Sequence, residues 1–360
     1  MSLPVLQLLG RLRPGDPASV HALGLDSRLR ERGRAGGVYA EEIDPRLARL
    51  ARPLPEAPRG DAWRVLHHPG RGATRLAAAG PGRLAVAVYE TPSTGVQTGL
   101  GREEHRARDL ARRELVALAR GRALGLAASA SLREPLLELG FARVEVLPPC
   151  PDPAVTAAAP APVLRRLLSD QRVNVLFAGR VAPGENLEEL LRVFAVYQRF
   201  VEPASRLLIA GDLEEHPGYF GALSRMADEL RLDEVVFQHA PGPGELRACY
   251  AASHVFLSLG REEAGAGRQR EALANGVPVI ALDAGAVRER LAGGGVLVPA
   301  VRHAELAELI DLVSRDPRLR EALAGARRAA LASLHEDPAA VLLDALEGAD
   351  RTSAPPGDPA

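Results

Sequence analysis

Two glutamates separated by seven residues bound the segment best suited to chemistry. Glu263 precedes the small-residue stretch 264–267, and Glu271 lies in segment 269–274, which is expected to be a helix. A glycine-containing loop leading into a helix directs backbone N–H groups and the positive end of the helix dipole at one place, which suits a phosphate. One carboxylate can then meet a sugar near the start of the helix, while the other accepts hydrogen bonds from ribose hydroxyls.

The flanking segments would position these residues. Residues 254–257 form a short apolar run typical of a buried strand, Gly276 is a helix stop, and a second apolar run covers 277–281. The predicted order is therefore strand, glycine-containing loop, helix and strand. In parallel sheets built from such units, ligands bind beyond the carboxyl ends of the strands.

The whole motif resembles the donor-sugar motif of the family 4 glycosyltransferases. The likeness rests on the two glutamates, the alanine after Glu271 and the ending Asn275-Gly276-Val277-Pro278-Val279-Ile280-Ala281, and it continues over residues 173–335. The resemblance implies the α/β fold called GT-B, in which two Rossmann-like, doubly wound domains face each other across a cleft. It also implies retaining transfer of a sugar from a nucleotide-sugar to the hydroxyl of a glycan or lipid-linked acceptor, in polysaccharide or glycoconjugate biosynthesis, with no cofactor or essential metal.

The resemblance also assigns roles to residues. Glu271 would hold the ribose of the nucleotide, and Glu263 would contact the transferred sugar and support charge at its anomeric carbon. The donor diphosphate would be bound by the loop amides and by Arg180, which follows the strand expected at 173–178, because a bidentate guanidinium suits a phosphate. The amides belong to Ala264, Gly265, Ala266 and Gly267. Gly15, in the loop after the first expected strand, would face donor and acceptor.

Three departures from the family pattern weaken the expectation of activity. Glu185 stands where the family usually has a lysine, and repulsion between this carboxylate and a diphosphate about 4 Å away would cost on the order of 1 to 4 kcal/mol. Residues 264–268 lack the usual aromatic residue and proline, and Arg268 or Arg270 would replace only part of the missing positive charge. Residues 88–93 lack the expected histidine. The alternative is a catalytically degenerate homologue that acts as a binding or scaffold subunit.

The overall composition narrows the class of protein. A chain of 360 residues exceeds one compact core, and 46% hydrophobic with 25% charged residues is typical of globular proteins. No apolar run approaches the roughly 20 residues that span a bilayer, and the N-terminus lacks the features of a signal peptide, so we expect a cytoplasmic protein. A net charge of −1 and 4% aromatic residues argue against nucleic acid as a partner. The spacing of Cys150 and Cys249 suits neither a metal nor a redox motif.

Alternating apolar runs and helical patterns predict two domains. Residues 1–150 would form the acceptor-side domain, 151–165 a proline- and alanine-rich linker without regular structure, and 166–335 the nucleotide-sugar domain. Residues 336–360 would be a C-terminal segment that ends in a disordered tail from Gly348. A dinucleotide-binding dehydrogenase is excluded, because no G-x-G-x-x-G pattern follows the first expected strand.

Two further features have a structural and a functional interpretation. The segment from Arg102 to Arg122 carries seven arginines against four acidic residues on a helical pattern. It is either a solvated amphipathic helix or a site of peripheral contact with the inner face of the membrane, which lipid-linked acceptors would favour.

His67 and His68 lie near the end of an expected strand. A lone histidine pair is more often structural than functional, and the sequence offers no other metal-ligand spacing.

Overall fold

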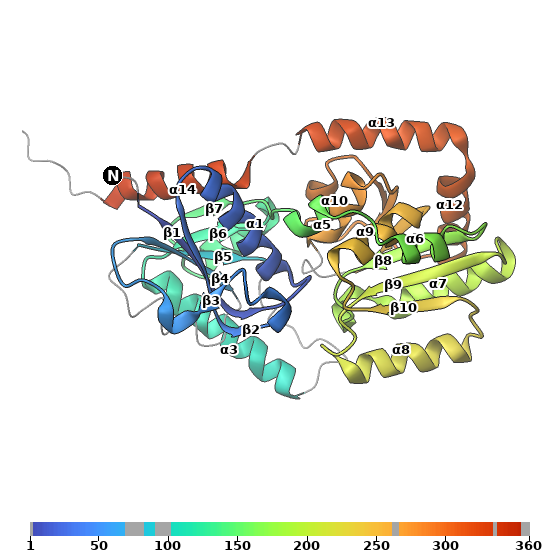
Figure 1. Cartoon of the computed structure of the whole chain (residues 1–360), viewed down its shortest axis with the longest axis horizontal. Coiled ribbons are helices and arrows are strands. Elements are labelled where there is room, and N and C mark those ends of the chain that lie inside the picture. The colour runs from blue at the N-terminus through green and yellow to red at the C-terminus, as the bar shows by residue number, and fades with distance from the viewer. Residues whose placement is uncertain (1–2, 69–82, 91–101, 261–265, 334–336, 354–360) are drawn as a thin grey trace, which may run out of the picture. The chain divides into compact units, whose positions relative to one another are not determined.

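The computed structural model describes residues 3–68, 83–90, 102–260, 266–333 and 337–353. The chain divides into two compact units, each with its own parallel sheet (Figure 1). Unit 1 comprises Met1–Cys150 and Glu336–Ala360, and unit 2 comprises Pro151–His335. Among the described residues, no helix combines the length and the apolar character needed to cross a bilayer.

Unit 1 is built on a seven-stranded parallel sheet in the order β3-β2-β1-β4-β5-β6-β7. The central strands are buried over nearly their whole length, as expected when helices cover both faces of a parallel sheet. The strands are β1 (Val5–Leu12), β2 (Ala35–Ile43), β3 (Arg52–Pro53), β4 (Trp63–His68), β5 (Arg83–Val88), β6 (Leu124–Ala127) and β7 (Val144–Val146). The described helices are α1 (Pro17–Glu31), α3 (Arg102–Arg120), α4 (Arg133–Glu138) and α14 (Pro338–Ser353), with short 3₁₀ turns at Pro45–Leu47, Leu54–Glu56 and Ala130–Leu132.

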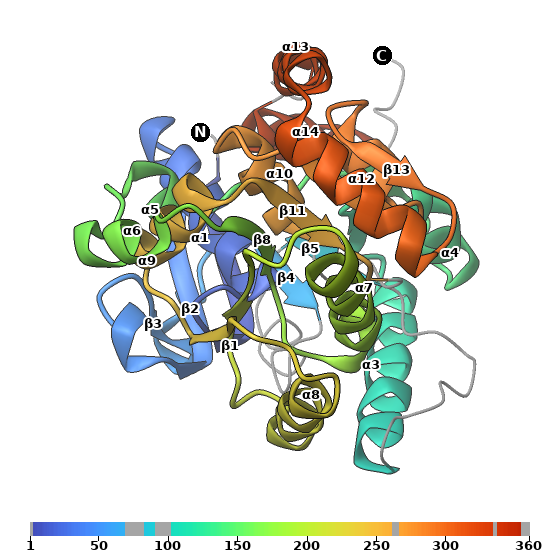
Figure 2. The same ribbon diagram turned by 90° about the vertical axis from the view of Figure 1, so that its right-hand side faces the viewer.

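Unit 2 has a six-stranded parallel sheet in the order β10-β9-β8-β11-β12-β13. The strands are β8 (Val173–Ala178), β9 (Ser205–Gly211), β10 (Val235–His239), β11 (Val255–Ser258), β12 (Val279–Leu282) and β13 (Val296–Val298). The longer helices are α7 (Leu187–Phe200), α8 (Pro217–Glu229), α9 (Pro243–Ala252), α10 (Ala266–Ala274), α12 (His303–Arg315) and α13 (Pro317–Ser333). Short helices are α5 (Pro153–Ala157), α6 (Pro162–Leu168), α11 (Val287–Leu291) and the 3₁₀ turn η4 (Pro183–Glu185). Helices α7 and α12 pack side by side over this sheet (Figure 2).

The prediction that 151–165 lacks regular structure is wrong. Proline occupies the first turn of both α5 and α6, where an N–H has no intrahelical partner to lose. Asp152 caps α5 by accepting hydrogen bonds from the N–H groups of Ala154 and Val155. The segment packs on α9 and buries Val155 and Leu168, so it belongs to unit 2.

The prediction of a disordered tail from Gly348 is also wrong for the residues up to 353. Helix α14 continues through Gly348 to Ser353, and its apolar side chains join the core of unit 1. Leu342 and Leu346, one helical turn apart, are fully buried there. Helix α14 packs beside α1, where Asp337 pairs with Arg28 and Arg32. The missed signal was the alanine- and leucine-rich stretch 339–346, which supplies a buried stripe.

The other expected elements are mostly present. Every predicted strand is found, and β3 was missed because two residues carry no detectable period. The sequence pattern also predicts a helix over residues 73–79, and these residues lie outside the described part of the chain. Helix α10 begins at Ala266, three residues earlier than predicted.

Candidate functional site

The start of α10 changes the setting of the predicted loop residues. Ala266 and Gly267 lie in the first helical turn rather than in a loop. The first N–H groups of a helix have no intrahelical acceptor, so both amides keep the geometry of an anion site. Glu263, Ala264 and Gly265 fall outside the described residues.

Glu271 is buried in the second turn of α10, and its carboxylate is engaged by unit 2. Oε2 accepts a hydrogen bond from the Tyr250 hydroxyl at 3.1 Å and from Arg268 Nη1 at 2.6 Å. Oε1 accepts a long bond of 3.4 Å from the N–H of Asp152. Burial, followed by the charge of Glu271, raises the pKa of Tyr250 well above its usual value, which keeps that hydroxyl protonated as a donor.

Arg180 follows β8, as predicted, and also holds a carboxylate. Its Nε and Nη2 lie 3.1 and 2.7 Å from Glu215 Oε1, and both side chains are about one quarter exposed. The backbone next to Arg180 is tightly packed: a Cβ added at Gly211 would lie 2.2 Å from the carbonyl oxygen of Gly179. The glycine at the end of β9 therefore lets the Gly179-Arg180 turn pass close by.

Glu185 ends the turn η4 and is buried, with 6% of its surface exposed. A Cβ added at Gly260 would lie 2.9 Å from Glu185 Oε2, so the carboxylate lies directly against a residue two positions beyond the end of β11. Strands β8 and β11 are neighbours in the sheet. The loop carrying Arg180 and Glu185 and the connection leading to α10 therefore share the carboxyl edge of this sheet.

In unit 1, the loop before α1 contains Gly15, which has a φ of 75°, a conformation that favours glycine. Asp16 caps α1 by accepting from the N–H of Ser19 at 2.9 Å and from its hydroxyl at 2.7 Å. These contacts fix the loop after β1. The role predicted for Gly15 toward donor and acceptor stays a prediction.

The same unit contains a buried chain of four polar side chains: Gln7, His67, Tyr89 and His21. His67 Nε2 lies 2.7 Å from Gln7 Oε1, and the Tyr89 hydroxyl lies 2.5 and 2.9 Å from Nδ1 of His67 and of His21. With Gln7 Oε1 as acceptor, neutral His67 donates from Nε2 and accepts the Tyr89 proton at Nδ1, so His21 Nδ1 donates to the Tyr89 oxygen. Among the described residues, His21 Nε2 is a buried atom without a hydrogen-bond partner.

Burial keeps these histidines neutral. It lowers the pKa of His21 to about 3 and that of His68 to about 4, and burial together with the charge of His21 lowers the pKa of His67. Tyr89 lies in the segment where the sequence lacked an expected histidine. The sequence did not single out His21, because one histidine in a helical pattern carries no signal of its own.

The structure thus brings together some of the predicted residues. Arg180 and the start of α10 lie at one edge of the unit 2 sheet, while Gly15 lies in unit 1. The partners Tyr250, Asp152 and Glu215 were not predicted. Among these contacts, the pair Arg268–Glu271 is the one that the sequence could have indicated, because opposite charges at i, i+3 on an expected helix lie close together.

Comparison with known proteins supports the resemblance. The sequence model of the family described as "Glycosyl transferases group 1" matches residues 165–329. Over 140 residues the chain is 34% identical to the GDP-mannose-dependent alpha-mannosyltransferase of Mycobacterium tuberculosis, covering 38% of this chain and 33% of that protein. A protein of the same description from Mycolicibacterium smegmatis is 35% identical over 130 residues, covering 36% and 31%. The match therefore spans about a third of the length of these curated relatives.

Solved structures match over nearly the whole chain. Anabaena HepE in complex with UDP-glucose has a TM-score of 0.72 at 18% identity and covers 97% of this chain and 100% of that chain. Sucrose-phosphate synthase from Thermosynechococcus elongatus has a TM-score of 0.73 at 17% identity, with 98% and 100% covered. At such low identity the likeness concerns the fold. Residues 165–329 are thus similar to the group 1 glycosyl transferases, and the chain, with its two Rossmann-like units, has the GT-B fold.

Proposed function

We propose that this protein is a retaining glycosyltransferase that moves a sugar from a nucleotide-sugar to an acceptor hydroxyl. The observation that carries the proposal is the buried carboxylate of Glu271 on the helix that follows β11, within the segment that matches the family. An acidic side chain near a helix start at the carboxyl edge of a parallel sheet suits a ribose.

The proposed chemistry is electrostatic. Arg180 and the first amides of α10, including those of Ala266 and Gly267, stabilise the leaving diphosphate. Glu271 positions the ribose, and Glu263 supports charge at the anomeric carbon. We propose that these groups act without a metal or cofactor.

The substrates are proposed from the relatives. Two similar proteins are described as GDP-mannose-dependent, and a similar fold was solved with UDP-glucose. We therefore propose GDP- or UDP-hexose donors and a glycan or lipid-linked acceptor in polysaccharide or glycoconjugate assembly, on the cytoplasmic side.

Turnover tests the proposal. The full chain is incubated with GDP-mannose or UDP-glucose and a panel of glycan and lipid-linked acceptors, and release of nucleoside diphosphate is followed together with the anomeric configuration of the product by NMR. We expect the release of nucleoside diphosphate to depend on the acceptor and the product to retain the anomeric configuration of the donor. The Arg180→Ala variant should lose this activity. An inverted product contradicts the retaining mechanism, and donor binding without turnover on any acceptor favours the degenerate scaffold alternative.

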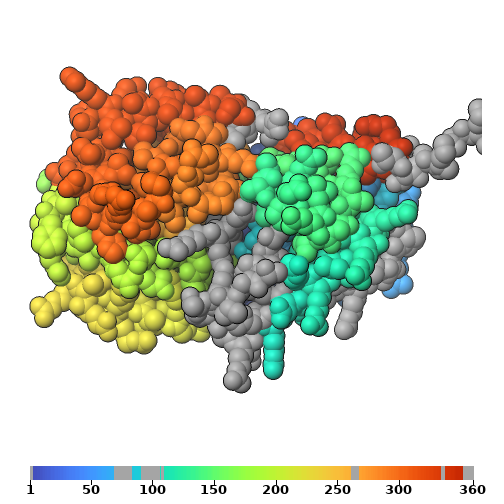
Figure 3. Space-filling model, turned by 180° about the vertical axis from the view of Figure 1, so that it is seen from behind, coloured from blue at the N-terminus to red at the C-terminus, as the bar shows by residue number. Residues whose placement is uncertain are grey.

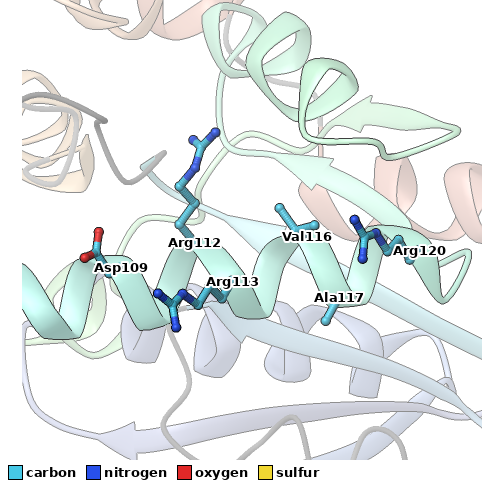
Figure 4. A pocket seen from close by; sticks show the side chains of 6 residues that line it. All are labelled: Asp109, Arg112, Arg113, Val116, Ala117 and Arg120. Carbon is cyan, nitrogen blue, oxygen red and sulfur yellow. The ribbon is translucent and has the colours of Figure 1, made fainter.

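The exposed face of α3 is the proposed site of membrane contact. Leu115 and Leu118 bury one face of α3 in unit 1, and Arg113, Ala117 and Arg120 on the other face are exposed, with Leu110 56% exposed. Figure 3 shows α3 at the surface of unit 1, and Figure 4 shows Arg112 and Arg113 pointing to different sides of the helix. Such a face suits anionic headgroups.

Vesicles test this contact. Sedimentation with anionic vesicles should fall in Arg113→Glu/Arg120→Glu, because both substitutions reverse the sign of the charge facing the headgroups. Equal sedimentation of this variant and the wild type would leave α3 as a solvated helix.

A further inference from the structure

The Arg268–Glu271 ion pair is buried on the helix that carries the proposed ribose site. The side chain of Arg268 is 14% exposed and that of Glu271 is 3% exposed, and their contact measures 2.6 Å. Although burial opposes the charged form of Arg268, the adjoining Glu271 raises the pKa of its guanidinium. The guanidinium of Arg268 is therefore charged at neutral pH.

This contact occupies the carboxylate that the ribose needs. A carboxylate holds a pair of neighbouring hydroxyls best when each of its oxygens accepts one hydrogen bond. Oε2 of Glu271 already accepts from both Arg268 and Tyr250, whereas the one bond to Oε1 from the described part of the chain is the long bond from the N–H of Asp152. Full contact with a ribose requires one donor to leave Oε2.

Of the two donors to Oε2, Arg268 is the one that can move to another anionic partner. It lies in the first turn of α10, where the helix N–H groups and dipole favour the diphosphate. A guanidinium that moves from Glu271 to a phosphate exchanges one anionic partner for another, so it avoids an unpaired buried charge. Tyr250 comes from α9 and is fully buried, so its hydroxyl stays with the carboxylate.

We propose that Arg268 is a latch on the ribose site that the donor diphosphate opens. In the free protein, Arg268 masks Glu271. When a nucleoside diphosphate binds, its phosphates draw the guanidinium away and Glu271 becomes available to the ribose. The latch rests on the proposed function, because it assumes that this site binds a nucleotide-sugar. It makes the site selective for nucleoside diphosphates over free nucleosides, which carry no group that releases Arg268.

If Arg268 is such a latch, one variant should change the affinities for nucleosides and for nucleoside diphosphates in opposite directions. Arg268→Gln leaves Glu271 a neutral, weaker donor, so guanosine or uridine should bind severalfold more tightly than to the wild type. GDP or UDP should bind about tenfold more weakly, as expected when a hydrogen bond to a charged group is lost. Titration calorimetry of the full chain with all four ligands measures both changes. Partial unfolding lowers both affinities, so it cannot produce this pattern.

Arg302→Gln is the matched control. Arg302, the N-cap residue of α12, and Glu305 in its first turn form an i, i+3 pair of the same types at 2.9 Å, with both side chains more than two thirds exposed. It should change neither affinity. Arg268→Met serves as the second variant if Arg268→Gln does not fold.

Each remaining outcome has one meaning. If the diphosphates bind more weakly to the Arg268 variants while the nucleosides do not gain, Arg268 is a fixed phosphate ligand and the latch is wrong. Unchanged affinities make the pair a purely structural contact, which also overturns the latch. If the wild type binds neither GDP, UDP nor their sugars, the proposed function itself fails.

Discussion

Two arginines near the proposed phosphate site already hold carboxylates in the free protein. Arg180 pairs with Glu215, and Arg268 pairs with Glu271. Burying these arginines without anionic partners would cost more folding free energy than burying them as pairs, because an unpaired charge loses its hydration without compensation. A diphosphate must therefore compete with Glu215 and Glu271, and donor affinity reflects the difference between these contacts.

Glu185 gives the first prediction at this scale. Because the residue is buried against Gly260, glutamine tests its charge at nearly constant volume. Glu185→Gln removes a repulsion of about 1 kcal/mol or more, so donor affinity should rise severalfold. Calorimetry with GDP- and UDP-sugars measures the change, and Glu305→Gln is the control, because the side chain of Glu305 is exposed. Unchanged affinity would mean that Glu185 does not face the diphosphate.

The buried histidines give a prediction of pH dependence. Their pKa is depressed in the folded state, so the unfolded chain takes up more protons below its ordinary histidine pKa of about 6.5. The contribution of the neutral histidines to the free energy of unfolding is therefore fully present above that pH. It is lost as the pH falls toward about 3, the pKa of His21. The thermal midpoint measured from pH 8 to 5 should fall more steeply in the wild type than in His21→Gln. A half-exposed control, His239→Gln, should keep the wild-type slope, and equal slopes in all three proteins would contradict this interpretation.

At the residue scale, the sequence predicts where Glu271 and Arg180 lie in the fold, but not which side chains they contact. Glu271 and Arg180 were recognisable because the family motif fixes their place after a strand. Their partners Tyr250 and Glu215 lie on separate segments of the chain, and single residues of common type give no period or motif. Those contacts depend on packing, which a sequence pattern does not encode.

At the scale of elements, the site depends on how closely two connections pass each other. The turn after β8 and the end of β9 meet at Gly179 and Gly211, and β8 pairs with β9 in parallel register. Hydrophobic periodicity predicted both strands, because buried parallel strands read as continuous apolar runs. It does not predict α5 and α6, because proline disfavours the interior of a helix but fits the first turn, where both of these helices have it.

Gly211→Ala tests the close approach. Its Cβ would lie 2.2 Å from the Gly179 carbonyl oxygen and 3.0 Å from Val181 Cγ2, so the backbone beside Arg180 must move. We expect a loss of about 1–3 kcal/mol in stability and a weaker donor affinity. Gly218→Ala is the control, since a Cβ there meets no atom within 4 Å. Thermal melts that place both variants at the wild-type midpoint would contradict the packing argument.

At the scale of the whole molecule, the chain returns to unit 1 after completing unit 2. Helix α14 places Leu342 and Leu346 in the core of unit 1, so that core is assembled from both ends of the sequence. The likeness to solved structures over nearly the full length fits this division into two Rossmann-like units. The sequence predicted their fold but not the return of α14, because a single amphipathic stripe does not say which unit it packs on.

Donor binding by the full chain tests the central claim most directly. Calorimetry should be run with GDP-mannose and UDP-glucose on the wild type and on Glu271→Ala. A charge-assisted hydrogen bond to the ribose contributes roughly 1.5–3 kcal/mol, so the wild type should bind one donor and the variant should lose at least about tenfold in affinity. Equal binding by a folded Glu271→Ala would contradict the assignment of this carboxylate to the ribose, and the absence of binding to the wild type would contradict the proposed activity.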